Sequence, residues 1–332
     1  MSLPDSVVNS LLEHSPLIEE RIISTLSMSK QEKLQSAMLY LLESGGKRLR
    51  ASLPYLVGEL LGNPLNSHYD VGAAIEIIHN FTLIHDDIMD NDSMRRGRPS
   101  VHKVFDVPTA INAGDAMLAV AFELISSSSD IEVEKLPELV KIIGGMVRNV
   151  SEGQQLDIDN ENRRDISIDN YLHMIEGKTA VMFEACARCG AILSGASEEE
   201  TELLGKWGLN LGLCFQIVDD LIDVISDSST SGKPLGSDLI QGKMTCMVIH
   251  AMNSSGNDLR HIEAVLGQGS RVTQDQINLA ISDLDKFGSI TYCRDLANKY
   301  HKISKESLMH FNESAGYKVL SELTDYHINR IK

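Results

Sequence analysis

The sequence lacks the features of a membrane-spanning or secreted protein. No stretch reaches the roughly 18 uninterrupted apolar residues that a spanning helix needs. Residues 1–5 carry neither the basic segment nor the apolar run of a signal peptide. The 5 cysteines are odd in number and scattered, which predicts thiols in a reducing, cytoplasmic setting. The spacing of Cys186 and Cys189 suits a metal or redox pair, but no second pair or nearby His completes such a site. Buried helix thiols are therefore the preferred interpretation.

Positive charge is also in short supply. The chain has 30 Lys and Arg against 47 Asp and Glu, a formal net charge of -17. A nucleic-acid-binding surface needs basic groups that neutralise phosphates, so nucleic acid is excluded as a partner. An anionic ligand would instead be held by local basic clusters or through bound cations. Hydrophobic residues make up 42% and charged residues 23%, which is the composition of a folded globular protein.

Alternating apolar and polar residues, the signature of strands, are missing as well. Apolar residues instead recur at three- and four-residue spacing, which predicts helices. The predicted helical segments are 6–23, 34–42, 48–61, 71–89, 110–125, 136–150, 168–193, 198–225, 243–252, 275–287, 290–308 and 315–331. The breaks between them are short and rich in turn-forming residues. We therefore expect one all-α domain, residues 1–332, with about a dozen helices.

Two aspartate clusters share the spacing D-D-x-x-D and lie 133 residues apart, at 86–90 and 219–223. Each follows an apolar helical run, so the first and last Asp of a cluster should lie about 5–6 Å apart on one helix face. Two carboxylates at that distance repel by ~3 kcal/mol, so folding stability gives no reason to keep them. Oxygen ligands without His or Cys indicate a hard cation, and Mg²⁺ is the best candidate. A solvated helix end would explain one cluster but not both.

Basic residues accompany these clusters. Residues 45–50 read GGKRLR, where two glycines precede a cationic helix start that suits an anion. Arg95 and Arg96 follow the first cluster, and His79 precedes it by two helical turns. Lys233 and Lys243 follow the second cluster. Cations bound to carboxylates, with Arg and Lys beside them, form a site suited to a diphosphate.

These motifs make the chain resemble the trans-isoprenyl diphosphate synthases, or polyprenyl synthetases. The resemblance runs from about residue 34 to the C-terminus and rests on GGKRLR at 45–50, HNFTLIHDDIMDNDSMRRGRPS at 79–100, GKT at 177–179, FQIVDDLID at 215–223, GKPLGSD at 232–238 and GK at 242–243. It implies helices around a deep central cavity, with the aspartate clusters facing each other across its mouth. It also implies a homodimer.

The resemblance assigns a role to each motif. It implies metal binding, with roughly three Mg²⁺ ions per active site once substrate is bound, by Asp86, Asp87, Asp90, Asp219, Asp220 and Asp223. It implies contacts to an allylic diphosphate for Arg95, Lys178, Lys233 and Lys243. It implies binding of the diphosphate of isopentenyl diphosphate by Lys47, Arg50, His79 and Arg96. Thr179 and Gln216 lie where the family places polar atoms near the developing carbocation.

In this family, bulky residues one to two turns before the first cluster set the depth of the cavity and so the product length. Phe81 and Ile78 are three residues apart and share a helix face, and the small Thr82 follows Phe81. This pattern resembles geranylgeranyl diphosphate synthases of the archaeal type. Farnesyl diphosphate is the alternative product, and a plain core role for Phe81 is the alternative to a cavity floor.

Two other functions compete with this one. A terpene cyclase of the same fold also ionises a diphosphate, but it replaces the second cluster by another metal motif and needs no isopentenyl diphosphate site. A non-catalytic synthase subunit usually lacks one aspartate cluster. Both clusters are whole here and the basic residues are present, so the sequence favours the synthase.

Overall fold

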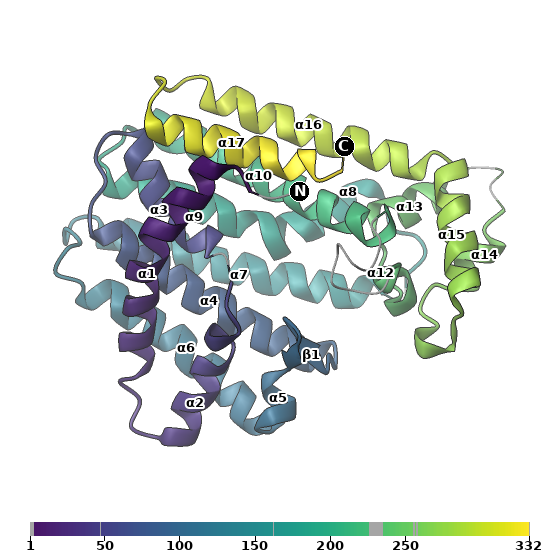
Figure 1. Cartoon of the computed structure of the whole chain (residues 1–332), viewed down its shortest axis with the longest axis horizontal. Coiled ribbons are helices and arrows are strands. Elements are labelled where there is room, and N and C mark those ends of the chain that lie inside the picture. The colour runs from purple at the N-terminus through teal and green to yellow at the C-terminus, as the bar shows by residue number, and fades with distance from the viewer. Residues whose placement is uncertain are drawn as a thin grey trace.

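Long α-helices make up almost all of the chain, as the periodicity predicts (Figure 1). The computed structural model describes residues 3–46, 48–161, 163–225, 235–254, 256 and 258–331. Its helices are α1 (Asp5–Leu26), α2 (Glu32–Tyr40), η1 (Leu42–Ser44), α3 (Leu49–Leu60), α4 (Ser67–Met89), α5 (Val101–Val104), α6 (Val107–Ser127), α7 (Leu136–Asn160), α8 (Ile168–Ile175), η2 (Glu176–Ala180), α9 (Val181–Leu193), α10 (Glu198–Ile225), α12 (Ser237–Gln241), α13 (Cys246–Asn253), α14 (Arg260–Glu263), η3 (Gly269–Arg271), α15 (Gln274–Lys286), α16 (Ser289–Leu308) and α17 (Ala315–Asn329). The all-α prediction is confirmed.

The long helices match the predicted segments closely. The short helices α5, α12, α14 and η3 were not predicted, and there are three further differences. Helix α7 continues ten residues beyond the predicted end at Val150, to Asn160. The predicted segment 168–193 is divided by a π-helical turn, η2, between α8 and α9. A two-stranded hairpin, β1 (Met94–Arg95) and β2 (Arg98–Pro99), follows α4 where no strand was expected. Strands of two residues are too short to show an alternating pattern in the sequence.

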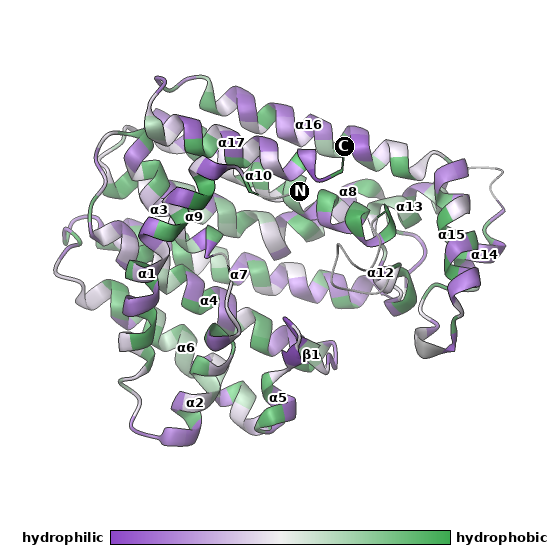
Figure 2. Ribbon diagram, viewed as in Figure 1, coloured by the Kyte–Doolittle hydropathy of each residue, from purple (hydrophilic) through white to green (hydrophobic). Residues whose placement is uncertain are grey.

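Helix α10 runs through the centre of the molecule and connects two apolar cores. Along its first half, Trp207 and Leu211 are fully buried in a core built mainly by α1, α3, α4, α6, α7 and α9. Along its second half, Ile217 and Leu221 are buried in a second core with α8, α13, α15 and α16. The long helices carry apolar and polar stripes along their length, which is how a helical bundle buries one face of each element (Figure 2).

Helix α6 has an unusual balance of burial and hydropathy. By length and composition alone it is the one helix in the described ranges that meets the criteria for crossing a membrane. Core helices of soluble proteins meet the same criteria, and α6 carries Asp115 and Glu123 within its length. Only 33% of its most apolar window is buried. Val107 and Ile111 are more than two-fifths exposed, so this apolar face has no partner within the described part of the chain.

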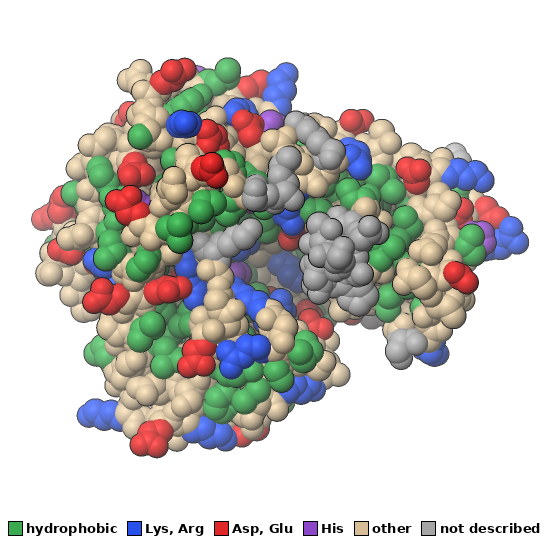
Figure 3. Space-filling model, viewed as in Figure 1, with side chains coloured by type: hydrophobic (Ala, Val, Ile, Leu, Met, Phe, Trp, Pro, Cys, Tyr) green, Lys and Arg blue, Asp and Glu red, His purple; other side chains and the backbone are tan. Residues whose placement is uncertain are grey.

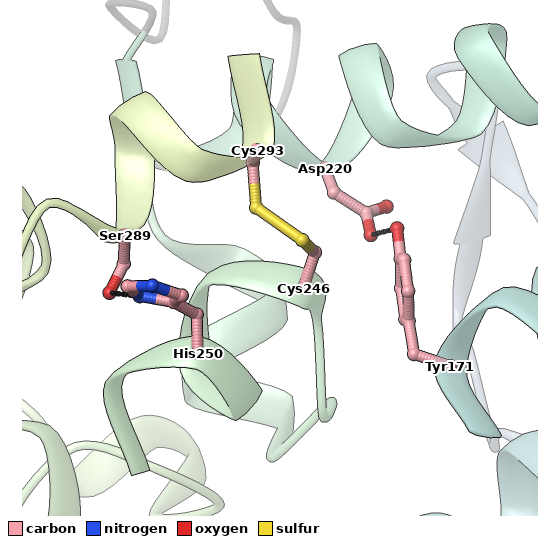
Figure 4. The surroundings of a disulfide bond; sticks show 6 residues. All are labelled: Tyr171, Asp220, Cys246, His250, Ser289 and Cys293. Atoms are coloured by element: carbon pink, nitrogen blue, oxygen red, sulfur yellow. Dashed lines mark hydrogen bonds between the residues drawn. A yellow bond between two sulfur atoms is a disulfide. The ribbon is translucent and has the colours of Figure 1, made fainter. Parts of the chain in front are cut away.

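The cysteines differ partly from the sequence prediction. Cys186, Cys189 and Cys214 are free, buried thiols on α9 and α10, as predicted. Cys246 of α13 and Cys293 of α16, in contrast, form a disulfide, so the prediction of scattered thiols is wrong for this pair (Figure 4). The two residues are 47 positions apart, and the packing of α13 against α16 brings them together. Such a pairing cannot be read from cysteine spacing alone.

Candidate active site

The first aspartate cluster lies at the C-terminal end of α4. Asp86 is in the last helical turn, and Asp90 caps the helix with its backbone N–H bonded to Asp86 O at 2.8 Å. Burial, together with the charges of Asp90 and Asp87, raises the pKa of Asp86 to about 6, although Lys178 opposes the shift. This turn therefore carries more negative charge than its surroundings neutralise, as a cation site requires.

Asp87, the middle carboxylate, has a different environment. It is fully buried, and the guanidinium of Arg95 on β1 donates to its Oδ1, with Nε at 2.8 Å. Burial raises the pKa of Asp87, and the bond from Arg95 works against that shift. The hairpin turn that presents Arg95 needs left-handed backbone at Arg96 and Gly97, with φ of 51° and 76°. Arg95 is thus bound to the cluster itself in this structure.

The three carboxylates of the second cluster, on α10, also have distinct environments. Asp219 is partly exposed and accepts a hydrogen bond from Arg330, at the end of α17, at 2.8 Å. Asp220 is buried, and burial raises its pKa to about 7. Asp223 accepts from the backbone N–H groups of Ser237 and Asp238 at 3.1 and 3.0 Å, so it satisfies the N-terminus of α12. Asp219 is the member with its carboxylate most open to a ligand.

Lys243 connects the two clusters. Its ammonium lies 3.7 Å from Asp238, and its side chain is 30% exposed. Burial would lower the pKa of Lys243, but the charges of Asp238, Asp157, Asp90 and Asp220 raise it. Because Asp90 belongs to the first cluster and Asp220 to the second, the fold brings the two clusters to one site. Figure 3 shows a hollow in the middle of the molecule in which Lys and Arg side chains (blue) gather.

The π-helical turn η2 presents Lys178 and Thr179 to this site. Lys178 forms an ion pair with Asp157 of α7. Thr179 donates to the amide oxygen of Gln216 on α10 at 2.9 Å. The turn packs directly on the backbone of α7 at Gly153, where an added Cβ would lie 2.2 Å from the Lys178 backbone nitrogen. Only glycine permits this approach, and an irregular helical turn of this kind is often found at functional sites.

A second group of cationic residues lies on α3, α4 and the hairpin. Arg50 Nη1 is 3.5 Å from His79 Nε2, and its guanidinium stacks on Phe183 with 4.6 Å to the ring centroid. Burial and the neighbouring charges of Arg50 and Arg96 lower the pKa of His79 far below its usual value. Burial also lowers the pKa of Arg96, which donates to Gly45 O at 2.6 Å. These residues gather positive charge in a desolvated place, which favours an anion.

The comparisons with known proteins agree with this geometry. Residues 31–284 match the family model for polyprenyl synthetases. The chain belongs to the polyprenyl synthetase family. It is 36% identical to a geranylgeranyl diphosphate synthase of Methanosarcina mazei, over 98% of both chains, and to a geranylfarnesyl diphosphate synthase of Natronomonas pharaonis, over 99% of both. The crystal structure of a geranylgeranyl pyrophosphate synthetase from Pyrococcus horikoshii superimposes with a TM-score of 0.92, at 34% identity and 98% coverage of each chain. The protein is accordingly a prenyltransferase.

The carboxylates suit the hard cation that a polyprenyl synthetase would use. In the described part of the chain, no three Asp, Glu, His or Cys side chains converge closely enough to hold a metal by themselves. Mg²⁺ typically takes one or two carboxylates and completes its shell with water and substrate phosphate, so this arrangement fits it. Asp86, whose pKa burial raises, and Asp90 lie one helical turn apart and are candidate ligands.

The residues predicted to set product length lie one to two turns before Asp86 on α4. Ile78 is fully buried and Phe81 is 9% exposed. The Phe81 ring meets His85 edge-on at 5.2 Å between centroids, and His85 packs on Gly114 of α6. Phe81 therefore lies toward the α4–α6 contact. Thr82 is half-buried and donates to His79 O at 2.8 Å.

Three site residues were missed by the sequence reasoning: Asp157, Asp238 and Arg330. Asp238 lies within the motif GKPLGSD at 232–238 but was given no role, whereas Asp157 and Arg330 are far in sequence from both clusters, where spacing carries no signal. Two predicted residues, Lys47 and Lys233, lie outside the described residues. Of the remaining predicted residues, several already have internal hydrogen-bond or ion-pair partners, namely Asp87, Arg95, Lys178, Asp219, Asp220 and Asp223. Arg50 lies beside His79.

Proposed function

We propose that this prenyltransferase condenses isopentenyl diphosphate with an allylic diphosphate and that its product is geranylgeranyl diphosphate. The observation that carries the proposal is a pair of different anion sites within one structure. One is built from carboxylates with Lys243 between them, and it suits a diphosphate held through cations. The other, with Arg50, His79 and Arg96, suits a diphosphate held directly. A two-substrate synthase needs both.

In this proposal Asp86, Asp90 and Asp219 hold Mg²⁺ directly, with roughly three ions bound in the substrate complex. When bound, these ions would stabilise the diphosphate as a leaving group. Asp87, Asp220 and Asp223 are buried and hydrogen-bonded within the protein, and they orient the site around the ions.

The chain's own groups then act on the allylic substrate. Lys178 and Lys243 take up charge on the departing diphosphate, and Lys233 and Arg95 are further candidates. The half-buried Thr179 and Gln216 present oxygen atoms toward the allylic carbons, where positive charge develops. No general-base side chain is needed if the departing diphosphate takes the proton.

The second substrate, isopentenyl diphosphate, is held for attack by the cationic residues around Arg50 and Arg96. Arg50 and Arg96, with Lys47, bind the isopentenyl diphosphate, while the neutral His79 donates a hydrogen bond to it. The low pKa of His79 means that it contributes a dipole and not a full charge. The double bond of isopentenyl diphosphate can then reach the allylic carbon without competition from water.

We place the floor of the product cavity at Phe81 and Ile78. Both are buried on the helix that carries the first cluster, and Phe81 lies between the site and α6. The likeness to the Methanosarcina mazei enzyme supports geranylgeranyl diphosphate as the product. Farnesyl diphosphate stays the shorter alternative, and the likeness to the Natronomonas pharaonis enzyme supports geranylfarnesyl diphosphate as the longer one.

We further propose that the protein is a homodimer that uses the exposed apolar face of α6. Val107 and Ile111 on α6, and Val140 on the adjacent α7, are all more than two-fifths exposed. A second copy would cover them by isologous contact. We also retain the cytoplasmic location predicted from the sequence as a proposal, which the free, buried thiols of Cys186, Cys189 and Cys214 support.

Product analysis tests the whole proposal. Purified protein with Mg²⁺ and isopentenyl diphosphate is given dimethylallyl, geranyl or farnesyl diphosphate in turn, and the products are identified by mass spectrometry. We expect each primer to be extended to geranylgeranyl diphosphate. Cyclic products without consumption of isopentenyl diphosphate would identify a terpene cyclase, and no consumption of any primer would identify a non-catalytic subunit.

A further inference from the structure

A chain of hydrogen bonds leads from the buried residue Tyr171 to the polar atoms of the site. The Tyr171 hydroxyl donates to Asp220 Oδ2 at 2.7 Å, as Figure 4 shows. Gln216 Nε2 donates to Asp220 Oδ1 at 2.9 Å, and Thr179 Oγ1 donates to Gln216 Oε1 at 2.9 Å. The burial is graded along this chain. Tyr171 and Asp220 are buried, whereas Gln216 and Thr179 are partly exposed to the site.

Local structure holds the first link in place. Helix α8 begins with a capping box, in which Ser167 and Asn170 satisfy each other's backbone N–H groups. Tyr171 follows directly, and it is 1% exposed. Gln216 and Asp220 are four residues apart on α10 and so share one face of that helix. The packing of α8 beside α10 then aims the phenol at the carboxylate.

The chain of bonds fixes which way the Gln216 amide points. Asp220 Oδ1 accepts from the NH₂ end of the amide and Asp220 Oδ2 accepts from the Tyr171 hydroxyl, so both carboxylate oxygens act as acceptors in this structure. The oxygen end must then face Thr179 and the site. A turned amide would place its oxygen against a carboxylate oxygen, with no proton between them. Thr179 cannot enforce the orientation, because its hydroxyl both donates and accepts.

We propose that Tyr171 is a positioning residue, which holds the Asp220 carboxylate so that the Gln216 amide keeps its oxygen toward the allylic carbons of the substrate. This inference rests on the proposed function, because the amide dipole matters only if positive charge develops there. An oxygen facing that charge stabilises it, and an NH₂ group would destabilise it. Without the phenol, nothing in the described structure holds Oδ2, and the carboxylate can rotate away from Gln216.

Two inhibitors of equal shape separate this role from simple structural support. The first is the ammonium compound 2-(dimethylamino)ethyl diphosphate, whose protonated nitrogen carries the charge of an allylic cation. The second is 3-methylbutyl diphosphate, which replaces that nitrogen by carbon and is neutral there. Both have the same diphosphate, so a change in the metal or lysine contacts affects them equally.

The test uses Tyr171→Phe in the full-length protein with Mg²⁺. We expect the inhibition constant of the ammonium compound to rise about tenfold, and that of the neutral compound to change less than about twofold. The turnover number should fall by about tenfold with the KM for isopentenyl diphosphate unchanged, less than the loss on removing a stabilising group directly. Tyr292→Phe is the matched control, because Tyr292 stacks on His250 outside this chain of bonds, and it should leave both constants unchanged.

Asp220→Asn is a second variant for the same inhibitor measurement if Tyr171→Phe does not fold. Because the Tyr171 hydroxyl can donate or accept, an asparagine side chain can present either its oxygen or its NH₂ group to Gln216, so the Gln216 amide loses its fixed orientation. We expect the same selective loss of the ammonium compound. Equal losses for both inhibitors, in either variant, or no loss in Tyr171→Phe, would overturn the positioning role. Failure of the wild-type protein to extend any primer would instead count against the proposed function.

Discussion

Replacing Asp86 by asparagine is expected to make the metal-free protein more stable while it abolishes catalysis. Burial and the neighbouring carboxylates raise the pKa of Asp86 from 3.8 to about 6. A carboxyl group whose pKa is higher in the folded state than in the unfolded state opposes folding once it is ionised. About two pKa units correspond to roughly 3 kcal/mol. Because Asp86 keeps some contact with water, we expect about 1–2 kcal/mol.

The sign of this effect gives a pH signature. Below about pH 4 the carboxyl group is protonated in both the folded and the unfolded chain, so wild type and Asp86→Asn should be equally stable. The advantage of the variant should appear as the pH rises from about 4 to 6 and stay constant above that. Urea unfolding in the presence of EDTA, at a series of pH values, measures it. Addition of Mg²⁺ with an unreactive diphosphate should stabilise the wild type more than the variant.

Asp115→Asn is the matched control, because this residue of α6 loses the same charge from an exposed position. It should change the free energy of unfolding by less than about 0.5 kcal/mol. The reasoning is refuted if Asp86→Asn is no more stable than Asp115→Asn at pH 7, or if its advantage does not depend on pH between 4 and 7.

Two further substitutions test the packing around the site. Gly153→Ala should lower the turnover number at least tenfold and destabilise the protein by about 1–3 kcal/mol, since its Cβ would overlap the backbone of Lys178. Steady-state kinetics and thermal unfolding measure these two effects. The control is Gly144→Ala, on the same helix with open space around it, which should be neutral or stabilising. Phe81→Ala should lengthen the product beyond that of the wild type in mass-spectrometric analysis, because it removes the ring that we place at the cavity floor. Phe105→Ala deletes an equal ring beside Tyr40 and should leave product length unchanged, so a normal product from Phe81→Ala would show that the floor lies elsewhere.

Helix type and position were largely predictable from the sequence because apolar periodicity depends only on neighbours along the chain. The predicted segment 198–225 coincides with α10 (Glu198–Ile225), and the aspartate clusters lie on α4 and α10 as expected. Periodicity could not reveal the π-helical turn Glu176–Ala180, whose backbone packs on Gly153 of another helix, because contacts between helices leave no spacing signal in the sequence.

The different environments of the aspartates could be known only from the tertiary structure. The spacing D-D-x-x-D predicts that the first and last carboxylates of each cluster share one helix face, and it treats the two clusters alike. The fold makes them unlike. Asp87 is buried against Arg95, and Asp223 completes the N-terminus of a short helix that comes after it in the chain. Each partner comes from another element, so only folding could assign these roles.

The sequence by itself thus determined the fold class, the residue types of the site and the class of chemistry, because all three follow from local pattern and the ligand preferences of carboxylate, Arg and Lys. Tertiary structure decided which carboxylates stay open to a cation, which cysteines pair, and how the Gln216 amide is turned toward Thr179. These depend on distances between residues tens of positions apart in the chain. Such distances are set by how helices pack, and no spacing along the sequence encodes them directly.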